Sequence, residues 1–374
     1  MTNQPKPILV GFLKTPGDSR VCILPKETKR IVSELKWTVL IESGIGDSLG
    51  ISDAEYEETG ASAASREEIF ASAMYVISLD HVYKEEEIQE GTHFIGIFNP
   101  LFYRNRLVSY EKNKLTVSSL DLLPRTTLAQ SMDVLSSMAS LAGYRAVIKA
   151  AALFNGILPM FTTAAGTITP AKVLILGAGV AGLQAIATAR RLGAVVEAFD
   201  VRAAAGEEVR SLGATFVEVE GHQESESAGG YAVEQSEEYK AKQKELIHKH
   251  ISSADIVIST ANIPGRKAPL LIENRSVEAM KEGSIIIDLA AEQGGNCALS
   301  KNNETVTHKG VTIVGNSNLS AEIPAAASKL LSNNFFSFLK HMTKAQENDP
   351  LIEGSQIMFE GNYTHPRFIE TQTN

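Results

Sequence analysis

Apolar residues recur along the chain in short runs that alternate with amphipathic stretches of helical period. Two of those stretches open with a serine, at Ser52 and Ser65, and a glutamate follows each serine three residues later, the pattern of a helix capping box. Strands that alternate with helices predict βαβ units and a mostly parallel sheet. In the first third of the chain the predicted strands span residues 7–12, 37–42, 74–79, 93–97 and 115–119.

A second alternating series comes after a long helical pattern. That pattern predicts a helix over 129–154, broken near Gly156 and Pro159. Six apolar runs with helices between them come next, as in a complete doubly wound nucleotide-binding domain. After Asn318 the pattern turns helical over 325–342 and ends in a polar tail. The six strands are predicted at 172–176, 194–199, 215–219, 255–260, 284–289 and 311–314.

These patterns predict an α/β chain with two doubly wound Rossmann-like domains joined by long helices. At 374 residues the chain is long for a single domain. We expect an N-terminal domain over 1–135, which a returning C-terminal helix within 322–374 completes, and a nucleotide-binding domain over 136–321.

A glycine-rich turn stands between one predicted strand and the next helix. The apolar run 172–176 leads directly into the sequence GAGVAG and then into a helical stretch, the context in which G-x-G-x-x-G indicates dinucleotide binding. The first glycine permits a tight turn, the second lets a pyrophosphate approach the backbone, and the third allows close helix–strand packing. Amides at the helix start then bind the negative charge. The predicted pyrophosphate-binding residues are Gly177, Ala178, Gly179, Val180, Ala181 and Gly182.

The following strand ends in a carboxylate. Asp200 stands roughly 20 residues after the glycine turn, where the acidic residue of this pattern accepts hydrogen bonds from ribose hydroxyls. A carboxylate there would repel an added 2′-phosphate, which favours NAD(H) over NADP(H) as the cofactor. Arg202 argues in the other direction, because a nearby arginine can accommodate that phosphate. The predicted ribose-binding residues are Asp200, Val201 and Arg202.

Two later strands also end in polar residues. Ligands of open α/β sheets bind outside the carboxyl ends of the strands, but polar residues and glycines there also serve in loop capping and turns. We favour a cofactor contact for Asn262 and Asp288, and both interpretations stay open for Glu292 and Asn296. The predicted cofactor-binding residues of these loops are Ala261, Asn262, Asp288 and Leu289.

Composition narrows the class of protein further. The net charge of −9 argues against nucleic-acid binding, which needs basic patches. The two cysteines are too few for a disulfide framework or a Cys-rich metal site, so we expect no metal. No apolar run approaches the roughly 20 residues needed to cross a bilayer, and the first residues lack the pattern of a signal peptide. We therefore expect a cytoplasmic protein.

Several motifs together resemble a known family. The stretch 177–202, GAGVAGLQAIATARRLGAVVEAFDVR, and the stretch 288–296, DLAAEQGGN, are similar to the NAD(H)-binding component of proton-translocating nicotinamide nucleotide transhydrogenases, which are related to alanine dehydrogenases. Pro124-Arg125, the run AQSMDVLSS at 129–137 and the run LAGYR at 141–145 strengthen this resemblance. The similarity covers nearly the whole chain and fades before Pro100 and after Asn318.

The resemblance implies a site, a cofactor and partners. It places Arg125, Gln130, Asp133 and Ser136 around the nicotinamide, although from the residues alone these four could equally make hydrogen bonds between domains. It aligns a loop that closes over bound nucleotide with the region of Tyr231, in a Glu-, Ser- and Gly-rich segment whose other interpretation is a solvated surface loop. It also implies a homodimer that hands hydride from NADH to NADP⁺ on a partner subunit. The partners would be an NADP(H)-binding subunit and a membrane-spanning subunit, which would hold the chain at the inner or plasma membrane.

The chain departs from the related dehydrogenases where their proton chemistry resides. Alanine dehydrogenases carry a lysine near the end of the strand at 75–79 and a histidine near 98–99, and this chain has Ser78 in the first region while His93 lies at a strand start. Oxidising an amino acid moves protons and needs an acid or base, whereas exchange between two nicotinamides moves only hydride. The sequence therefore favours transhydrogenation. The alternatives are an alanine dehydrogenase-like amino-acid oxidoreductase and a noncatalytic NAD-binding regulatory module.

Overall fold

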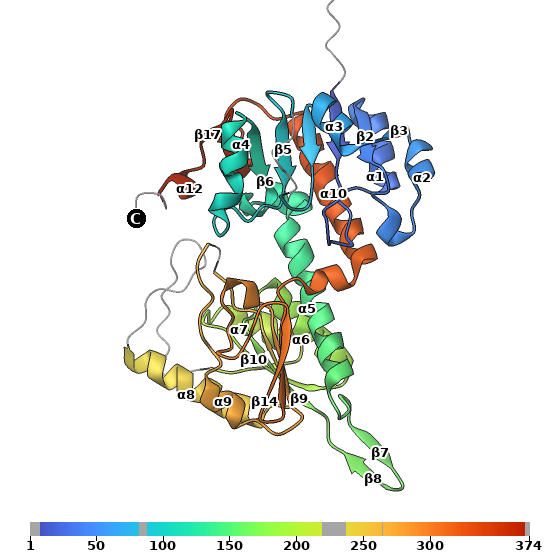
Figure 1. Ribbon diagram of the computed structural model, residues 1–374. Helices are drawn as coiled ribbons and strands as arrows, with labels where there is room; N and C mark the ends of the chain where they lie inside the picture. Colours follow the sequence, from blue (N-terminus) through green and yellow to red (C-terminus); the bar gives the residue numbers. More distant parts are fainter. Residues whose placement is uncertain (1–7, 82–87, 219–236, 264, 371–374) are drawn as a thin grey trace, which may run out of the picture. The chain divides into compact units, whose positions relative to one another are not determined.

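The computed structural model describes residues 8–81, 88–218, 237–263 and 265–370, and the chain divides into two units (Figure 1). Unit 1 consists of Met1–Met138 and Ile323–Asn374, and unit 2 of Ala139–Glu322. The chain passes between them inside helix α5 (Val134–Leu153) and just before helix α10 (Pro324–Met342). Each unit has its own largely parallel sheet with helices, which confirms the predicted fold class.

Unit 1 contains an eight-stranded sheet in the order β17-β16-β6-β5-β4-β1-β2-β3. The six strands that come first along the chain, β1 to β6, pair in parallel. They have the strand order of a doubly wound nucleotide-binding fold. The hydrophobic pattern missed β3, because its residues are alanine and serine, which carry little strand signal. The six strands are β1 (Leu9–Phe12), β2 (Thr38–Glu42), β3 (Ala61–Ala64), β4 (Tyr75–Ile77), β5 (His93–Gly96) and β6 (Thr116–Ser119).

The prediction of a polar C-terminal tail is wrong. Helix α11 (Pro350–Ser355) leads into β16 (Gln356–Phe359), which pairs antiparallel with β6 and extends the sheet of unit 1. Strand β17 (Asn362–Tyr363) and helix α12 (Pro366–Glu370) follow. The segment is held by a few buried apolar residues spread through a polar sequence, too sparse for a periodic pattern; they are Leu351, Ile357, Met358 and Phe368.

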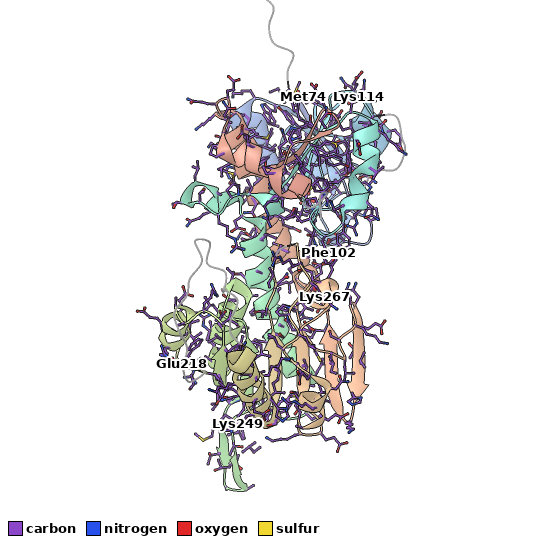
Figure 2. The ribbon with its side chains drawn as sticks, turned by 90° about the vertical axis from the view of Figure 1, so that its left-hand side faces the viewer. Met74, Phe102, Lys114, Glu218, Lys249 and Lys267 are labelled. Carbon is purple, nitrogen blue, oxygen red and sulfur yellow. The ribbon has the colours of Figure 1, made fainter. Side chains whose placement is uncertain are left out.

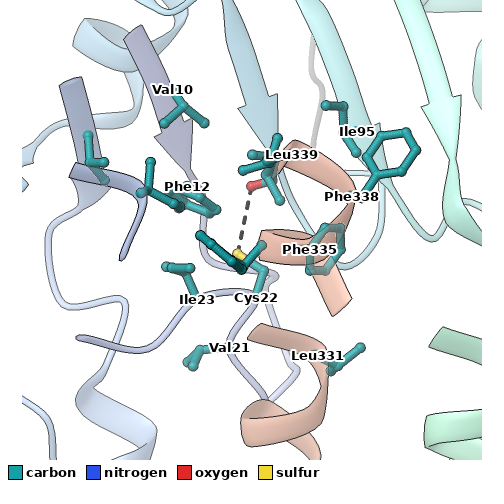
Figure 3. Packing of buried hydrophobic residues seen from close by; sticks show 14 of the residues in the cluster. Val10, Phe12, Val21, Cys22, Ile23, Ile95, Leu331, Phe335, Phe338 and Leu339 are labelled. Carbon is teal, nitrogen blue, oxygen red and sulfur yellow. Dashed lines mark hydrogen bonds between the residues drawn. The ribbon is translucent and has the colours of Figure 1, made fainter. Parts of the chain in front are cut away.

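Helix α10 returns to unit 1 and builds its core. Its apolar face packs around Cys22, as Figure 3 shows, and burial raises the pKa of the Cys22 thiol to about 12. The hydroxyls of Ser328 and Ser332, both fully buried on α10, accept hydrogen bonds from the backbone N–H groups of Val21 and Leu24 at 2.9 Å. The core residues that α10 contributes include Leu331, Phe335, Phe336, Phe338 and Leu339.

Unit 2 contains a seven-stranded sheet in the order β11-β10-β9-β12-β13-β15-β14. Six strands are parallel in the same doubly wound order, and β14 adds an antiparallel edge. The sequence pattern missed β14 and a separate hairpin of β7 (Phe161–Thr163) and β8 (Gly166–Ile168), whose residues are all exposed. The strands of the sheet are β9 (Lys172–Leu176), β10 (Val195–Phe199), β11 (Thr215–Phe216), β12 (Ile256–Ser259), β13 (Ile285–Asp288), β14 (Glu304–His308) and β15 (Val311–Gly315).

The predicted helix over 129–154 is not continuous. Residues Thr127–Met132 form a 3₁₀ helix, Asp133 breaks it with a ψ of 89°, and α5 begins at Val134. The break arises because the Asp133 side chain bonds the first turn of α5 and so starts a new helix.

Most other predicted helices begin where the sequence indicates. The capping boxes at Ser52 and Ser65 are confirmed, with the Glu55 and Glu68 carboxylates each accepting a hydrogen bond from the serine backbone N–H at 2.8 Å. The remaining helices are α1 (Pro25–Arg30), α2 (Asp53–Glu57), α3 (Arg66–Ser72), α4 (Val108–Lys112), α6 (Val180–Arg191), α7 (Ala205–Ser211), α8 (Glu237–Ser253) and α9 (Asn274–Glu278).

Candidate functional site

The glycine turn of unit 2 has the geometry of a phosphate-binding loop. Strand β9 ends at Leu176, and Gly177 turns the chain with a φ of +100°, a conformation that glycine adopts without strain. A Cβ at Gly182 would lie 1.8 Å from the carbonyl oxygen of Gly177, so only glycine lets helix α6 pack this closely on the turn. A Cβ at Gly179 would meet no atom within 4 Å. The turn is therefore tight beneath the helix start and open at its middle glycine.

The start of helix α6 presents its amides without a side-chain cap. Gly179 is the N-cap residue and has no side chain to bond the first amides of the helix. Gly179 and Val180 are exposed, Ala181 is half-buried, and Ala178 is buried. Amide donors at the amino end of a helix, with space above the backbone, suit a bound pyrophosphate.

Asp200 stands beside this turn at the end of strand β10. Its side chain is 7% exposed, and its carboxylate accepts a hydrogen bond from the backbone N–H of Ala178 at 2.7 Å. Arg202 donates to the same carboxylate from Nε at 2.9 Å and from Nη2 at 3.0 Å. The aspartate is thus held against the turn, and the arginine neutralises part of its charge. Val201, between them, is exposed.

The loop after β12 forms the other side of the turn. The hydroxyl of Thr260 donates to the carbonyl oxygen of Gly177 at 3.0 Å. The backbone nitrogen of Ala261 lies 3.2 Å from the point where a Cβ of Gly177 would stand. Asn262 follows and is exposed. The loop therefore lies against the glycine turn and presents Asn262 outward, while Thr260 is a contact that sequence analysis missed because its signal was a single threonine after a strand.

Asp288 is placed differently from Asp200. It is fully buried at the end of β13, and its carboxylate accepts hydrogen bonds from the backbone N–H groups of Ala290, Asn296 and Cys297 at 2.9–3.0 Å. Burial raises the pKa of this carboxyl group, and the three N–H donors oppose that rise. These contacts hold the loop that follows β13. The observed hydrogen bonds of Asp288 are those of a residue that caps a loop. A direct contact of Asp288 with the cofactor stays a prediction.

The other residues of this loop differ in their exposure to solvent. Glu292 is exposed, Leu289 is half-buried, and Asn296 is fully buried. Lys267, labelled in Figure 2, lies across Gly294 of the same loop, since a Cβ at Gly294 would come within 2.8 Å of the lysine Cε. Glu292 could reach a ligand, and Asn296 acts inside the protein.

The four residues expected at the nicotinamide all belong to unit 1. Arg125 and Gln130 are exposed, Arg125 before and Gln130 within the 3₁₀ helix. Asp133 accepts hydrogen bonds from the backbone N–H of Ser136 at 2.8 Å and from its hydroxyl at 2.6 Å, so this pair caps α5. Arg125 and Gln130 have their polar groups available, whereas Asp133 and Ser136 bond each other. Tyr231 lies outside the described residues.

His93 and Ser78 of unit 1 are poorly suited to proton transfer. His93 opens strand β5, its Nε2 lies 2.9 Å from the Ser118 hydroxyl, and burial lowers its pKa to about 4. Ser78 is fully buried and donates to the carbonyl oxygen of Asp80 at 2.7 Å. An imidazole with so low a pKa is a weak base, and the hydroxyl of Ser78 is already hydrogen-bonded.

Membrane spans and metal clusters are both missing from the described residues. None of the helices there combines the length and the apolar character that a membrane span requires. Within the same part of the chain, no three His, Cys, Asp or Glu side chains gather into a group that could hold a metal ion.

A glycine turn at the first strand, open amides at the helix start and a carboxylate at the end of the next strand define a dinucleotide-binding Rossmann domain. Family comparison agrees with this class. Residues 14–142 match the family model "Alanine dehydrogenase/PNT, N-terminal domain" and residues 146–366 match "Alanine dehydrogenase/PNT, C-terminal domain". The chain belongs to the alanine dehydrogenase/PNT family.

Individual relatives sharpen the comparison. The chain is 43% identical over 370 residues to the first part of NAD(P) transhydrogenase subunit alpha of Rhodospirillum rubrum, covering 94% of this chain and 96% of that one. It is 41% identical to the protein of the same name from Rickettsia prowazekii, with 93% of each chain covered. The solved transhydrogenase structure from Sinorhizobium meliloti superposes with a TM-score of 0.86 at 40% identity, over 95% of this chain and 99% of that one. An L-alanine dehydrogenase structure, at 22% identity and a TM-score of 0.83 over 98% and 99% of the two chains, shares the fold.

Proposed function

We propose that this chain binds NAD(H) in unit 2 and serves as the NAD(H)-binding component of a nicotinamide nucleotide transhydrogenase. The observation that carries the proposal is the glycine turn with Asp200 held against it by the Ala178 amide. The names of the relatives from Rhodospirillum rubrum and Rickettsia prowazekii support the reaction class.

The residues of unit 2 have separate tasks in this proposal. The amides at the start of α6 bind the pyrophosphate, since the helix has no side-chain cap there. Asp200 accepts hydrogen bonds from the ribose hydroxyls and disfavours a 2′-phosphate. Because Arg202 neutralises part of that carboxylate, we expect the preference for NAD(H) to rest on the space beside Asp200 as well as on its charge.

The reaction needs orientation of the nicotinamide rather than proton transfer. When bound, the nicotinamide supplies a hydride that passes from C4 of NADH to C4 of NADP⁺, leaving NAD⁺ and NADPH with no proton to move. We propose that Arg125, Gln130, Asp133 and Ser136 act at the nicotinamide, Gln130 by direct contact and Asp133 with Ser136 by fixing the first turn of α5. Such residues favour the reaction by holding the reacting carbons about 3–3.5 Å apart and by excluding water.

Partners complete the proposal. NADP(H) would be held by a partner subunit, and a membrane-spanning subunit would couple the exchange to proton movement, with this chain a homodimer at the cytoplasmic side of the inner or plasma membrane. We place Tyr231 in a loop that closes over bound nucleotide, and we assign Ala261, Asn262, Asp288 and Leu289 to the cofactor site.

The main rival is an alanine dehydrogenase-like oxidoreductase. Its chemistry requires a proton acceptor; the low pKa of His93 makes this residue a weak one, and the Ser78 hydroxyl is already hydrogen-bonded. Turnover of NAD⁺ with L-alanine by the chain alone would establish this rival. A second rival, a noncatalytic NAD-binding regulatory module, predicts binding without hydride transfer.

The test is stopped-flow hydride transfer from NADH to NADP⁺ with an added NADP(H)-binding component. We expect Gln130→Ala to lower the transfer rate about 10- to 100-fold, which is about 1.4–2.7 kcal/mol of lost orientation, with NADH affinity changed less than about threefold. If the wild-type pair shows no transfer and the chain alone does not turn over L-alanine, while NADH still binds, the regulatory module is the rival that stands.

A further inference from the structure

Asn296 is fully buried, and every polar group of its side chain is hydrogen-bonded. Its Oδ1 accepts a hydrogen bond from the Ser259 hydroxyl at 2.7 Å, and its Nδ2 donates to the carbonyl oxygens of Ala261 at 2.9 Å and Pro269 at 2.8 Å. Carbonyl oxygens only accept, so the amide nitrogen must face them and the Ser259 hydroxyl must be the donor. The orientation of the carboxamide is therefore determined by its partners.

Both backbone polar groups of Asn296 are hydrogen-bonded as well. Its N–H donates to the buried Asp288 carboxylate, and its carbonyl oxygen accepts hydrogen bonds from the N–H groups of Leu271 and Ile272 at 2.9 Å. Gly295, with a φ of +76°, lets the chain approach closely enough, since a Cβ there would lie 2.8 Å from Asp288 Oδ2. Asn296 thus connects the end of β13 to the end of β12 and to the connection that follows β12.

That connection is the loop that lies against the glycine turn. Ala261, whose carbonyl oxygen Asn296 binds, has its nitrogen next to Gly177, and Thr260 bonds the Gly177 carbonyl oxygen. Strand β9 lies between β10, which ends in Asp200, and β12, which leads into Ala261. Asp200 and the 260–262 loop therefore flank the turn on opposite sides, and a dinucleotide extends to both sides of such a switch point.

We infer that Asn296 is a positioning residue for the side of the dinucleotide site opposite Asp200: through Ser259, Ala261 and Pro269 it fixes the 260–262 loop against the phosphate-binding turn. This inference rests on the proposed binding of NAD(H). Asn296 acts through these contacts, because all the polar groups of its side chain are bonded to other residues of the chain.

The experiment compares NADH and AMP binding to purified variants by isothermal titration. AMP carries one ribose and one phosphate, so it uses the Asp200 side and the turn, whereas NADH also uses the side of the 260–262 loop. We expect Asn296→Ala to weaken NADH binding about tenfold or more and AMP binding less than about threefold, because three buried hydrogen bonds are lost on one side only. Asp200→Ala should weaken both ligands.

Two further variants separate positioning from loss of stability. Ser259→Ala removes one bond of the network and should weaken NADH binding about two- to fivefold, and it decides the matter if Asn296→Ala does not fold. The matched control is Ser276→Ala, another buried serine of unit 2, whose hydroxyl lies 3.0 Å from His248 Nδ1 away from the turn; it should lower the unfolding midpoint without changing NADH affinity.

The outcomes distinguish this inference from the proposed function. If the wild-type chain binds neither NADH nor AMP, the proposed function fails. If the wild type binds NADH and Asn296→Ala and Ser259→Ala bind it equally well, or if both variants lose NADH and AMP in the same proportion, the positioning role is overturned and cofactor binding stands. At saturating NADH, hydride transfer by Asn296→Ala should keep the wild-type kcat, because Asn296 holds the loop and not the reacting ring.

Discussion

The two units of this chain have the same strand order around their first strand and differ in the connection after that strand. In unit 2, β9 turns through three residues into helix α6, whose amides are open to a ligand. In unit 1, β1 ends at Phe12 and helix α1 begins only at Pro25, after a connection that includes the buried Leu13. Proline lacks an N–H group, so the start of α1 offers fewer donors to a phosphate.

The second strands of the two units, in contrast, end alike. Both end in a carboxylate, Asp200 in unit 2 and Glu42 in unit 1. In unit 1 Arg66 donates to both oxygens of Glu42, at 3.1 and 2.8 Å, and the backbone N–H of Lys14 donates at 2.8 Å. Asp200 is bonded in the same way, by Arg202 and by the Ala178 N–H of the glycine turn, so the two carboxylates are alike and the loops beside them differ. The difference between the units therefore lies in the loop after the first strand, which is short in unit 2 and long in unit 1.

Replacing a glycine in each unit should give the largest difference between the units in NADH binding. In Gly182→Ala the new Cβ would meet the backbone oxygen of Gly177 at 1.8 Å, so the turn must shift, and we expect loss of NADH binding by about 100-fold or more with about 2–4 kcal/mol of lost stability. In Gly11→Ala of β1 the new Cβ would meet the Ile69 side chain at 2.2 Å. That overpacking should cost about 1–3 kcal/mol with NADH affinity unchanged. Fluorescence titration and urea unfolding measure both effects, and equal loss of affinity in the two variants would contradict the contrast.

The strand-end carboxylates provide a second matched pair. Asp200→Ala should weaken NADH binding about tenfold, the loss of about 1.4 kcal/mol of charged hydrogen bonding, and should reduce discrimination against NADPH. Glu42→Gln should leave both nucleotides unaffected and lower stability by about 1 kcal/mol through the Arg66 pair. An unchanged NADH:NADPH preference in Asp200→Ala would refute the assignment of that residue.

Acid should destabilise unit 1 through His93. Burial lowers the folded-state pKa of this histidine to about 4, while an unfolded histidine titrates near about 6.5. Between these values the unfolded chain binds a proton that the folded chain does not, so stability is full above the unfolded pKa and falls by up to a few kcal/mol as the pH decreases towards about 4. Urea unfolding followed from pH 7 to pH 4 should show this loss, and His93→Gln should reduce it. A variant with the same pH dependence as the wild type would assign the loss to other groups.

The smallest effect concerns an ion-pair group of unit 2. Glu322 accepts from Arg145 Nε at 2.9 Å and also pairs with Lys149 on α5. Burial alone would raise the pKa of Glu322, but the hydrogen bonds from Lys149 and Arg145 outweigh it and lower the pKa. This stabilisation is present above the unfolded pKa of about 4.3 and is lost as the pH falls through the lower folded value. Glu322→Gln should cost about 1 kcal/mol at pH 7 and less at pH 3; a cost independent of pH would count against the charge.

The sequence by itself determined those features of the proposed NAD(H) site that depend on local backbone conformation. The glycine turn, the helix behind it and Asp200 at the next strand end are short-range features, because steric limits on the turn and the two-residue period of a strand act within a few positions. The two capping boxes and the break after α5 are of the same kind. The sheet class followed from strands that alternate with helices.

Tertiary structure decided the features that depend on residues distant in the sequence. Strand β16 joins β6 across more than two hundred residues, and Asn296 could be distinguished from a ligand contact only once Ser259, Ala261 and Pro269 were seen around it. The same holds for the partner of Glu42, since Arg66 stands 24 residues away in the sequence. Hydrogen bonds and burial between distant segments carry no periodic signal along the chain, so only the fold shows which of these residues meet.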